Sequence, residues 1–184
     1  MPKKLKGPVK KVWESKIKQA PSKNTHISYS SLSTYNKCPK LWELMYLRNE
    51  VPFTQNIYTC FGTAMHETIQ EWLTVMYHDK VKAANDMNKH QLLYSNMIKA
   101  YKQGKAQNGH EHFSNQDELT KFWIDGKHIL DFLEKKRGGY FSTRNMMLAG
   151  VETLLYQEIK PGVVFKGLVD LVFYHPNTDR WTIM

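Results

Sequence analysis

The sequence lacks any long apolar run. No stretch approaches the ~20 residues that a helix needs to cross a bilayer, so we expect no membrane segment. The N-terminus carries lysines but no apolar segment of the kind found in a secretory signal. Cysteine is scarce as well, and two residues, Cys38 and Cys60, are too few for a disulfide framework. These absences favour a cytoplasmic protein in a reducing compartment.

The chain is also short of acids, and its charge is unevenly spread. Its 184 residues are 41% hydrophobic and 12% aromatic, which predicts one globular domain. Residues 1–23, however, hold eight lysines against a single acid, Glu14. Such a basic arm either binds a polyanion, with nucleic acid as the first choice, or is a solvated tail that aids solubility. The lysines assigned to nucleic-acid binding are Lys3, Lys4, Lys6, Lys10, Lys11, Lys16 and Lys18.

Hydrophobic periodicity divides the chain into a flexible basic arm, 1–27, and a folded domain, 28–184. Helical spacing comes first and strand-like runs follow, which predicts an α+β fold with N-terminal helices packed on a small mixed or antiparallel sheet. The expected helix boundaries are a cap at Ser30 or Ser31, a start at Pro39, a start near Gly62, a helix over 88–106, a capping box of Ser114 with Asp117, and an end at Gly138-Gly139. The expected strands are 148–159, 163–174 and 180–184.

One carboxylate, Asp170, interrupts the apolar strand predicted over 163–174. Both faces of this strand are apolar, so we expect it inside the sheet, with Asp170 poorly solvated. A buried carboxylate without a partner is costly, because its charge leaves water. Either a bound divalent cation or a salt bridge to Lys166, two positions away on the same face, would remove that cost.

Three motifs occur in a fixed order along the chain. They are "S-x-S-S-L-x-x-Y-x-x-C-P-x-x-W" from Ser28 to Trp42, "FGTAMHE" from Phe61 to Glu67, and a "VE" at Val151 followed by "GLVDLV" from Gly167 to Val172. Together they resemble the RecB-like branch of the PD-(D/E)XK nuclease superfamily, which includes phage and CRISPR-associated exonucleases. The resemblance covers roughly residues 28–184. No single motif is specific, and the order and spacing carry the match.

The resemblance implies a restriction-endonuclease-like core and a catalytic set of Asp170, His66 and Glu152. His66 and Asp170 correspond to metal ligands, and Glu152 to an upstream glutamate of less defined role. It further implies Mg²⁺ or Mn²⁺ as cofactor and DNA as substrate, cleaved by exonuclease or endonuclease action. Phage or bacterial recombination, repair or replication is the implied setting, in the cytoplasm of a bacterium or a phage-infected host cell. A helicase or recombination partner is an expectation of the same kind, and no oligomeric state follows from the sequence.

The family pattern continues with an acid, any residue and a lysine, directly after the strand that corresponds to "RWTI". The sequence ends at Met184, before that element. We therefore expect the nuclease-like domain to be incomplete at its C-terminus and this chain to be inactive alone. The alternative is a non-catalytic fragment that binds DNA or a protein partner.

Several residues have plainer interpretations beside the functional ones. Cys38 matches a cysteine of the iron–sulfur subset of these nucleases, but residues 61–184 contain no cysteine, so a cluster is not supported. His66 is either a metal ligand or a core histidine, and Gly62 is expected to let its helix pack closely against the hairpin. His110 and His112 fit a loop better than a zinc site. Five aromatic residues could stack on bases but are expected in the core: Tyr29, Trp42, Tyr46, Tyr58 and Phe61.

Overall fold

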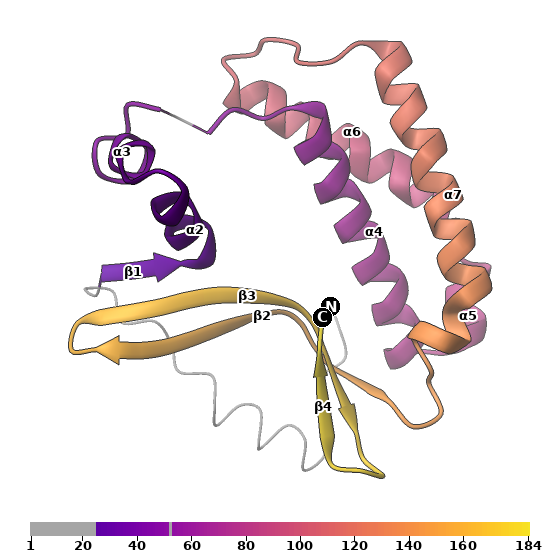
Figure 1. Cartoon of the computed structure of the whole chain (residues 1–184). Coiled ribbons are helices and arrows are strands. Elements are labelled where there is room, and N and C mark those ends of the chain that lie inside the picture. Colours follow the sequence, from indigo (N-terminus) through magenta and orange to yellow (C-terminus); the bar gives the residue numbers. More distant parts are fainter. Residues whose placement is uncertain (1–24, 52) are drawn as a thin grey trace.

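A computed structural model describes residues 25–51 and 53–184. Helices precede a long hairpin, as Figure 1 shows. The elements run in the order β1 (Thr25–Ser28), α2 (Tyr29–Lys37), α3 (Pro39–Trp42), the π-helical turn η1 (Glu43–Leu47), α4 (Ile57–His78), α5 (Val81–Asp86), α6 (Lys89–Gln107), α7 (Gln116–Tyr140), β2 (Met147–Lys160), β3 (Val163–His175) and β4 (Arg180–Ile183). β1 thus begins inside the range assigned to the basic arm, and the rest of that arm lies outside the described residues.

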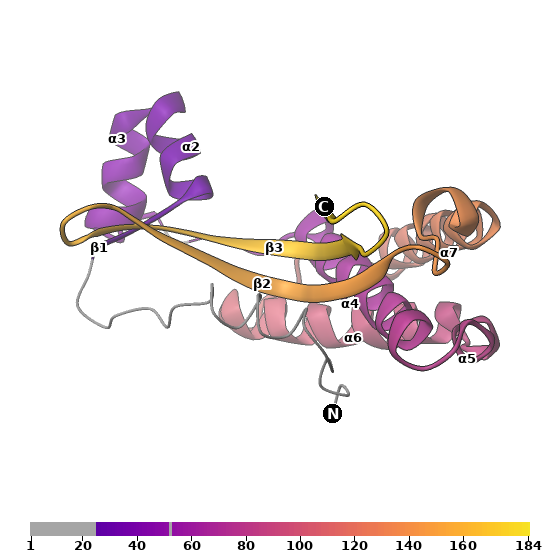
Figure 2. The same ribbon diagram turned by 90° about the horizontal axis from the view of Figure 1, so that it is seen from below.

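The sheet is mixed and is organised around β3. β2 pairs antiparallel with β3 along nearly its whole length, while β1 pairs parallel with one end of β3 and β4 antiparallel with the other. The α2–η1 helices lie at the β1 end and α4 to α7 toward the β4 end (Figures 1 and 2). The predicted α+β class is confirmed, and β3 is the interior strand that its apolar faces predicted.

Side-chain caps set the starts of the helices. The observed caps of α4 and α2 differ from the predicted ones. α4 begins at Ile57, not near Gly62, because Asn56 and Thr59 form a reciprocal capping box one turn earlier. Ser28, not Ser30 or Ser31, caps α2 by accepting a hydrogen bond from the backbone N–H of Ser31.

α7 also differs from its prediction at both ends. Its cap is Asn115, whose side chain accepts from the backbone N–H of Glu118, so the expected Ser114–Asp117 box is off by one position. The helix continues through Gly138 and Gly139 to Tyr140. The two glycines keep helical geometry there, so they do not act as a C-terminal cap. Pro39 does occupy the first turn of α3, as predicted.

α4 is the helix that joins both halves of the core. Its apolar face is buried at Met65, Trp72, Leu73 and Met76. One cluster packs α4 and α5 against the hairpin and consists of Trp72, Leu73, Met76, Ala84, Phe141, Leu148, Leu171 and Phe173. The other packs α4 against α6 and α7 and consists of Ala64, Met65, Leu93, Met97 and Leu130. Within residues 25–51 and 53–184, no helix is both long and apolar enough for a membrane span.

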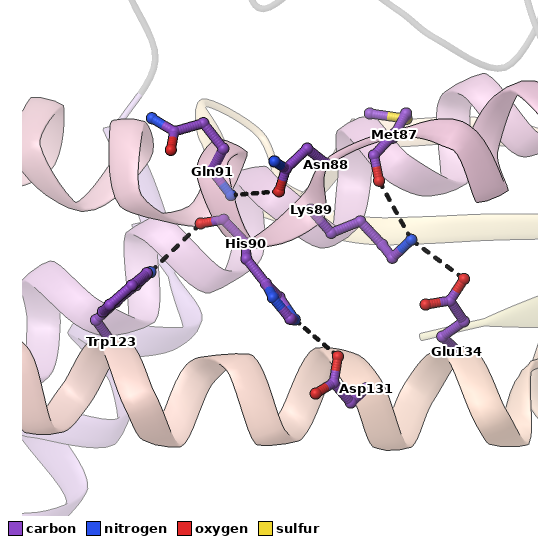
Figure 3. A network of polar contacts seen from close by, with 8 residues as sticks. All are labelled: Met87, Asn88, Lys89, His90, Gln91, Trp123, Asp131 and Glu134. Carbon is purple, nitrogen blue, oxygen red and sulfur yellow. Dashed lines mark hydrogen bonds and ion pairs between the residues drawn. The ribbon is translucent and has the colours of Figure 1, made fainter.

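A buried lysine fastens the start of α6 to α7 (Figure 3). The Lys89 side chain is only 6% exposed. Its Nζ donates to Glu134 Oε1 at 3.2 Å and to the Met87 carbonyl at 3.4 Å, and it lies 5.9 Å from the ring centroid of Trp72. A charge this far from water depends on such partners, because its desolvation is costly.

A second, more exposed pair lies beside it in Figure 3. His90 Nε2 lies 2.7 Å from Asp131 Oδ1, and Trp123 Nε1 donates to the His90 carbonyl at 3.3 Å. Both side chains of this pair are at least 40% exposed, so water screens the interaction.

Removing the carboxylate of Glu134 should therefore destabilise the helical layer. Glu134→Ala is expected to lower the free energy of unfolding by on the order of 2 kcal/mol, because Lys89 keeps a buried charge without its anionic partner. Lys89→Met should cost less, since it removes the charge and keeps the apolar stem. Urea unfolding measures both. Asp131→Ala is the matched control, with an expected loss below about 1 kcal/mol. A loss in Asp131→Ala equal to that in Glu134→Ala would contradict the burial argument.

Candidate functional site

Two carboxylates face each other across the β2–β3 hairpin. Thr153 pairs with Val169, and the pairs on both sides keep the same register, so Glu152 lies opposite Asp170. Opposite residues of neighbouring strands project from the same face of a sheet. Like charges in this arrangement repel and destabilise the pairing. The hairpin therefore holds two negative groups where apolar or oppositely charged side chains would be more stable.

The backbone at Glu152 is unusual for a strand. Its φ is 48°, in the left-handed region that side-chain-bearing residues rarely adopt. The other described non-glycine residues with positive φ, Asn49, His110 and Asp179, lie in turns or loops. A conformation of this kind costs of order 1–3 kcal/mol and is concentrated at functional sites. Backbone strain and charge repulsion thus coincide at one position.

α4 brings a histidine to the same place. His66 Nε2 lies 3.4 Å from Glu152 Oε1 and 3.8 Å from Asp170 Oδ1. The helix is anchored two turns later by Leu73, which is fully buried against the hairpin, and this anchor fixes how far His66 extends over the strands. All three residues that the sequence singled out as catalytic are therefore brought together.

A fourth side chain, Gln70, belongs to the cluster. The sequence motifs did not predict this residue as part of the site. Gln70 Nε2 contacts His66 Nε2 from one turn further along α4. The available signal was its spacing of four residues from His66, which puts both side chains on one face of a helix. This contact is made at Nε2, the same nitrogen that faces both carboxylates, so Gln70 competes with an ion for that atom instead of orienting the ring through the other nitrogen.

The expectation that Asp170 is poorly solvated is wrong. The side chains of Asp170 and Glu152 are both 58% exposed, and that of His66 is 33% exposed. Val172 on the same face is buried, but Lys166, Leu168 and Asp170 are exposed, so cover ends before the site. The alternative salt bridge to Lys166 is not formed either, since the ion-pair partner of Asp170 among the described residues is His66. Solvent access, rather than burial, characterises the site.

The strand edge beside Asp170 is open. β1 and β4 use the same edge of β3, because β2 occupies the other. β1 ends opposite Lys166, and Met184 exchanges two backbone hydrogen bonds, of 3.1 and 3.0 Å, with Leu171. Between them, no strand in the described part of the chain pairs with residues 167–170 on this edge. Asp170 is the last residue of this stretch, next to Leu171.

The donors suit a divalent cation in chemistry and in pairwise distance. Carboxylate oxygens are the ligands that Mg²⁺ and Mn²⁺ prefer, and Mn²⁺ also accepts imidazole. Two atoms that each bind one ion at about 2.1 Å lie no more than about 4.2 Å apart, and both separations from His66 Nε2 meet this limit. Across residues 25–51 and 53–184, however, no group of three or more His, Cys, Asp and Glu side chains is arranged so that it could hold an ion. The residues fit the ion as donors without forming a closed shell.

The two cysteines lie in different environments. Cys38 is exposed and caps α3, where its Sγ accepts from the backbone N–H of Leu41. Cys60 is buried in α4, and burial raises the pKa of its thiol to about 11, so it stays protonated near neutral pH. Cys38 is thus the more reactive thiol.

The non-functional interpretations of the loop histidines and of the aromatic residues are confirmed in part. His110 and His112 lie in the loop between α6 and α7, and the ring nitrogens of His112 contact Tyr101 and Lys105. The prediction that the five named aromatic residues pack in the core is wrong for three. Tyr29, Tyr58 and Tyr46 are 75%, 71% and 40% exposed.

Gly62 does not pack closely against the hairpin, because a Cβ atom at this position would have no neighbour within 4 Å among residues 25–51 and 53–184. The lysines from Lys3 to Lys18 lie outside the described residues.

Comparison with known proteins agrees with this geometry. The model of the PD-(D/E)XK nuclease superfamily matches residues 26–184, which is most of the chain, and the protein belongs to this superfamily. Its members generally use divalent metal ions, and DNA is the substrate that the family implies. No curated protein matches the chain.

Because the backbone at Glu152 is strained, replacing this residue should stabilise the folded protein. Glu152→Asn replaces the carboxylate by a neutral group that tolerates left-handed backbone, and it should raise the free energy of unfolding by about 0.5–1 kcal/mol. Metal-free urea unfolding measures this gain. His110→Asn, at a left-handed loop position remote in sequence, is the matched control for the backbone term alone. A less stable Glu152→Asn variant would show that the carboxylate contributes favourably to the fold, contrary to this interpretation.

Proposed function

We propose that the chain forms the metal-binding core of a DNA nuclease of the RecB-like type, in which His66, Glu152 and Asp170 hold a divalent ion. The observation that carries the proposal is the convergence of both carboxylates on His66 Nε2, at 3.4 and 3.8 Å. The order of the three sequence motifs supports the RecB-like assignment, and with it a setting in phage or bacterial recombination, repair or replication. A helicase or recombination partner remains part of this proposal.

Each side chain has a definite task in the proposed site. Glu152 and Asp170 supply the negative charge that attracts a cation, and their mutual repulsion falls when one binds. His66 must be neutral to donate the lone pair of Nε2, and the Gln70 amide would have to leave that atom when an ion binds. The exposure of both carboxylates leaves room for a phosphate group beside them. A bound divalent ion supplies the activation of water and the neutralisation of charge on the phosphate.

Across residues 25–51 and 53–184, His66, Glu152 and Asp170 do not form a closed shell for an ion. This openness favours a second candidate function, namely binding of DNA, or of a protein partner, without cleavage. β4 adds neither an acid nor a lysine to the three side chains. A site that lacks one electrostatic group typically loses 10²–10³ in rate.

Ion binding tests the proposed site directly. Titration of the metal-free chain with Mn²⁺, followed by electron paramagnetic resonance, should show one weak site. His66→Ala and Asp170→Asn should each lower its affinity by about tenfold or more, because each removes a ligand. Asp131→Asn, which alters an exposed carboxylate paired with a histidine elsewhere, is the control and should bind as the unchanged chain does.

Cleavage assays with the same samples separate the two candidate functions. We expect the chain to bind DNA in Mn²⁺ without hydrolysing it. Hydrolysis that is lost in Asp170→Asn would show that the site is complete without the acid and lysine of the family pattern. Mn²⁺ affinity that is equal in all four proteins would remove the proposed site altogether.

The basic arm is proposed to contact DNA phosphates. Deletion of residues 1–23 should weaken binding and reduce the slope of log affinity against log salt by about 0.9 for each lysine that contacts a phosphate of duplex DNA. Fluorescence anisotropy over a range of salt concentrations measures both quantities. An unchanged affinity and slope would identify the arm as a tail that serves solubility.

A further inference from the structure

α4 leaves the sheet at the candidate site. Its C-terminal half is covered by the hairpin through Trp72 and Leu73, but its N-terminal half extends beyond the strands (Figure 1). On the side that carries His66, this half presents Tyr58, Gly62 and Thr63, and all three are exposed. We refer to Tyr58, Gly62 and Thr63 as the α4 exit face. Gly62 lies one turn, ~6 Å, from His66 along the axis, and Tyr58 lies two turns, ~12 Å.

Nothing in the described part of the chain requires glycine at position 62. Gly62 sits inside a 22-residue helix without a positive φ, and a Cβ atom there would meet none of the described residues within 4 Å. Glycine in the interior of a helix is less stable than alanine, because it loses more backbone freedom on folding. A glycine that the helix does not need can serve binding instead, because it lets a ligand approach the helix backbone closely.

The two neighbours of Gly62 offer matching contacts. Thr68 and Thr74 in the same helix donate their hydroxyls to the carbonyls four residues earlier, each at 2.7 Å. The hydroxyl of Thr63 has no such bond among the described residues, so it is available as a donor. Tyr58 is 71% exposed and meets Phe122 edge-on at a centroid distance of 5.4 Å, which leaves a ring face open to water.

We propose that a single DNA strand leaves the catalytic site along the α4 exit face, with its backbone over Gly62, a phosphate oxygen accepting from Thr63, and a base stacked on Tyr58. This inference rests on the proposed function, because it starts from a phosphate held at His66. A strand that follows α4 from there has one open direction, since the other is filled by the core. The occupant is single-stranded, because stacking on Tyr58 requires a base with an unoccupied face.

Binding of a fluorescein-labelled oligothymidylate to the full chain tests the exit face. Gly62→Leu should weaken binding by about tenfold by blocking the approach, and Tyr58→Ala should do so by removing the stacking partner. Gly62→Ala should be the more stable protein, with a thermal midpoint about 2–4 °C higher, and yet bind less tightly. A loss of binding together with a gain in stability excludes misfolding as the cause.

Matched controls lie on α7. Gly138→Leu changes another exposed helical glycine with no neighbour within 4 Å of a Cβ atom, and Tyr140→Ala changes another half-exposed tyrosine. Neither should alter binding. The inference is overturned if these controls weaken binding as much as the exit-face variants, or if Gly62→Leu and Tyr58→Ala bind normally. It is also overturned if the unchanged chain binds duplex as tightly as single strands, or binds no oligonucleotide, which would leave a protein partner as the occupant.

Mn²⁺ titration of the same variants separates this inference from the proposed function. Gly62→Leu and Tyr58→Ala leave the ion-binding side chains intact, so their Mn²⁺ affinity should equal that of the unchanged chain. Normal Mn²⁺ binding with normal oligonucleotide binding in these variants would refute the exit face and keep the metal site. Absence of Mn²⁺ binding with selective loss of oligonucleotide binding would refute the metal site and keep the exit face.

Discussion

The repulsion between Glu152 and Asp170 is the constraint around which the site is built. The β2–β3 register places the two carboxylates opposite each other, and a one-residue slip would send one of them to the other face of the sheet. Apolar residues on both sides of the pair, such as Val151, Leu171 and Val172, hold that register by packing. The energy of the core therefore maintains an arrangement that the two charges themselves oppose.

α4 couples this arrangement to the rest of the protein. Its C-terminal half belongs to the cluster under the hairpin, and its N-terminal half belongs to the cluster with α6 and α7. His66 lies where the helix passes from cover into solvent. The contacts of Lys89 with Glu134 and Met87 join the start of α6 to α7 in the same helical layer. Stability comes from these buried layers, so the site itself can remain strained, charged and exposed.

Much of this could be predicted from the sequence, and the errors have physical causes. Periodicity predicted the element types, because alternation and helical spacing follow the pattern of burial. The starts of α4 and α7 differ from the prediction, because Asn56 and Asn115 accept the capping hydrogen bonds and periodicity does not show which polar residue does so.

For the site, the family resemblance identified His66, Glu152 and Asp170. The solvation of Asp170, the opposition of the carboxylates and the contact with Gln70 depend on strand register and on what covers each face. Those are tertiary properties that a single strand's pattern does not contain.

The exposed side chain of Leu168, two positions from Asp170 on the same face of β3, has a consequence for how chains of this protein meet one another. An apolar side chain in water favours association with another apolar surface, and a charged neighbour opposes it. The carboxylate proposed to bind an ion would therefore also oppose self-association of this face. An ion that neutralises it would weaken this protection, so ion binding and solubility would depend on the same side chain.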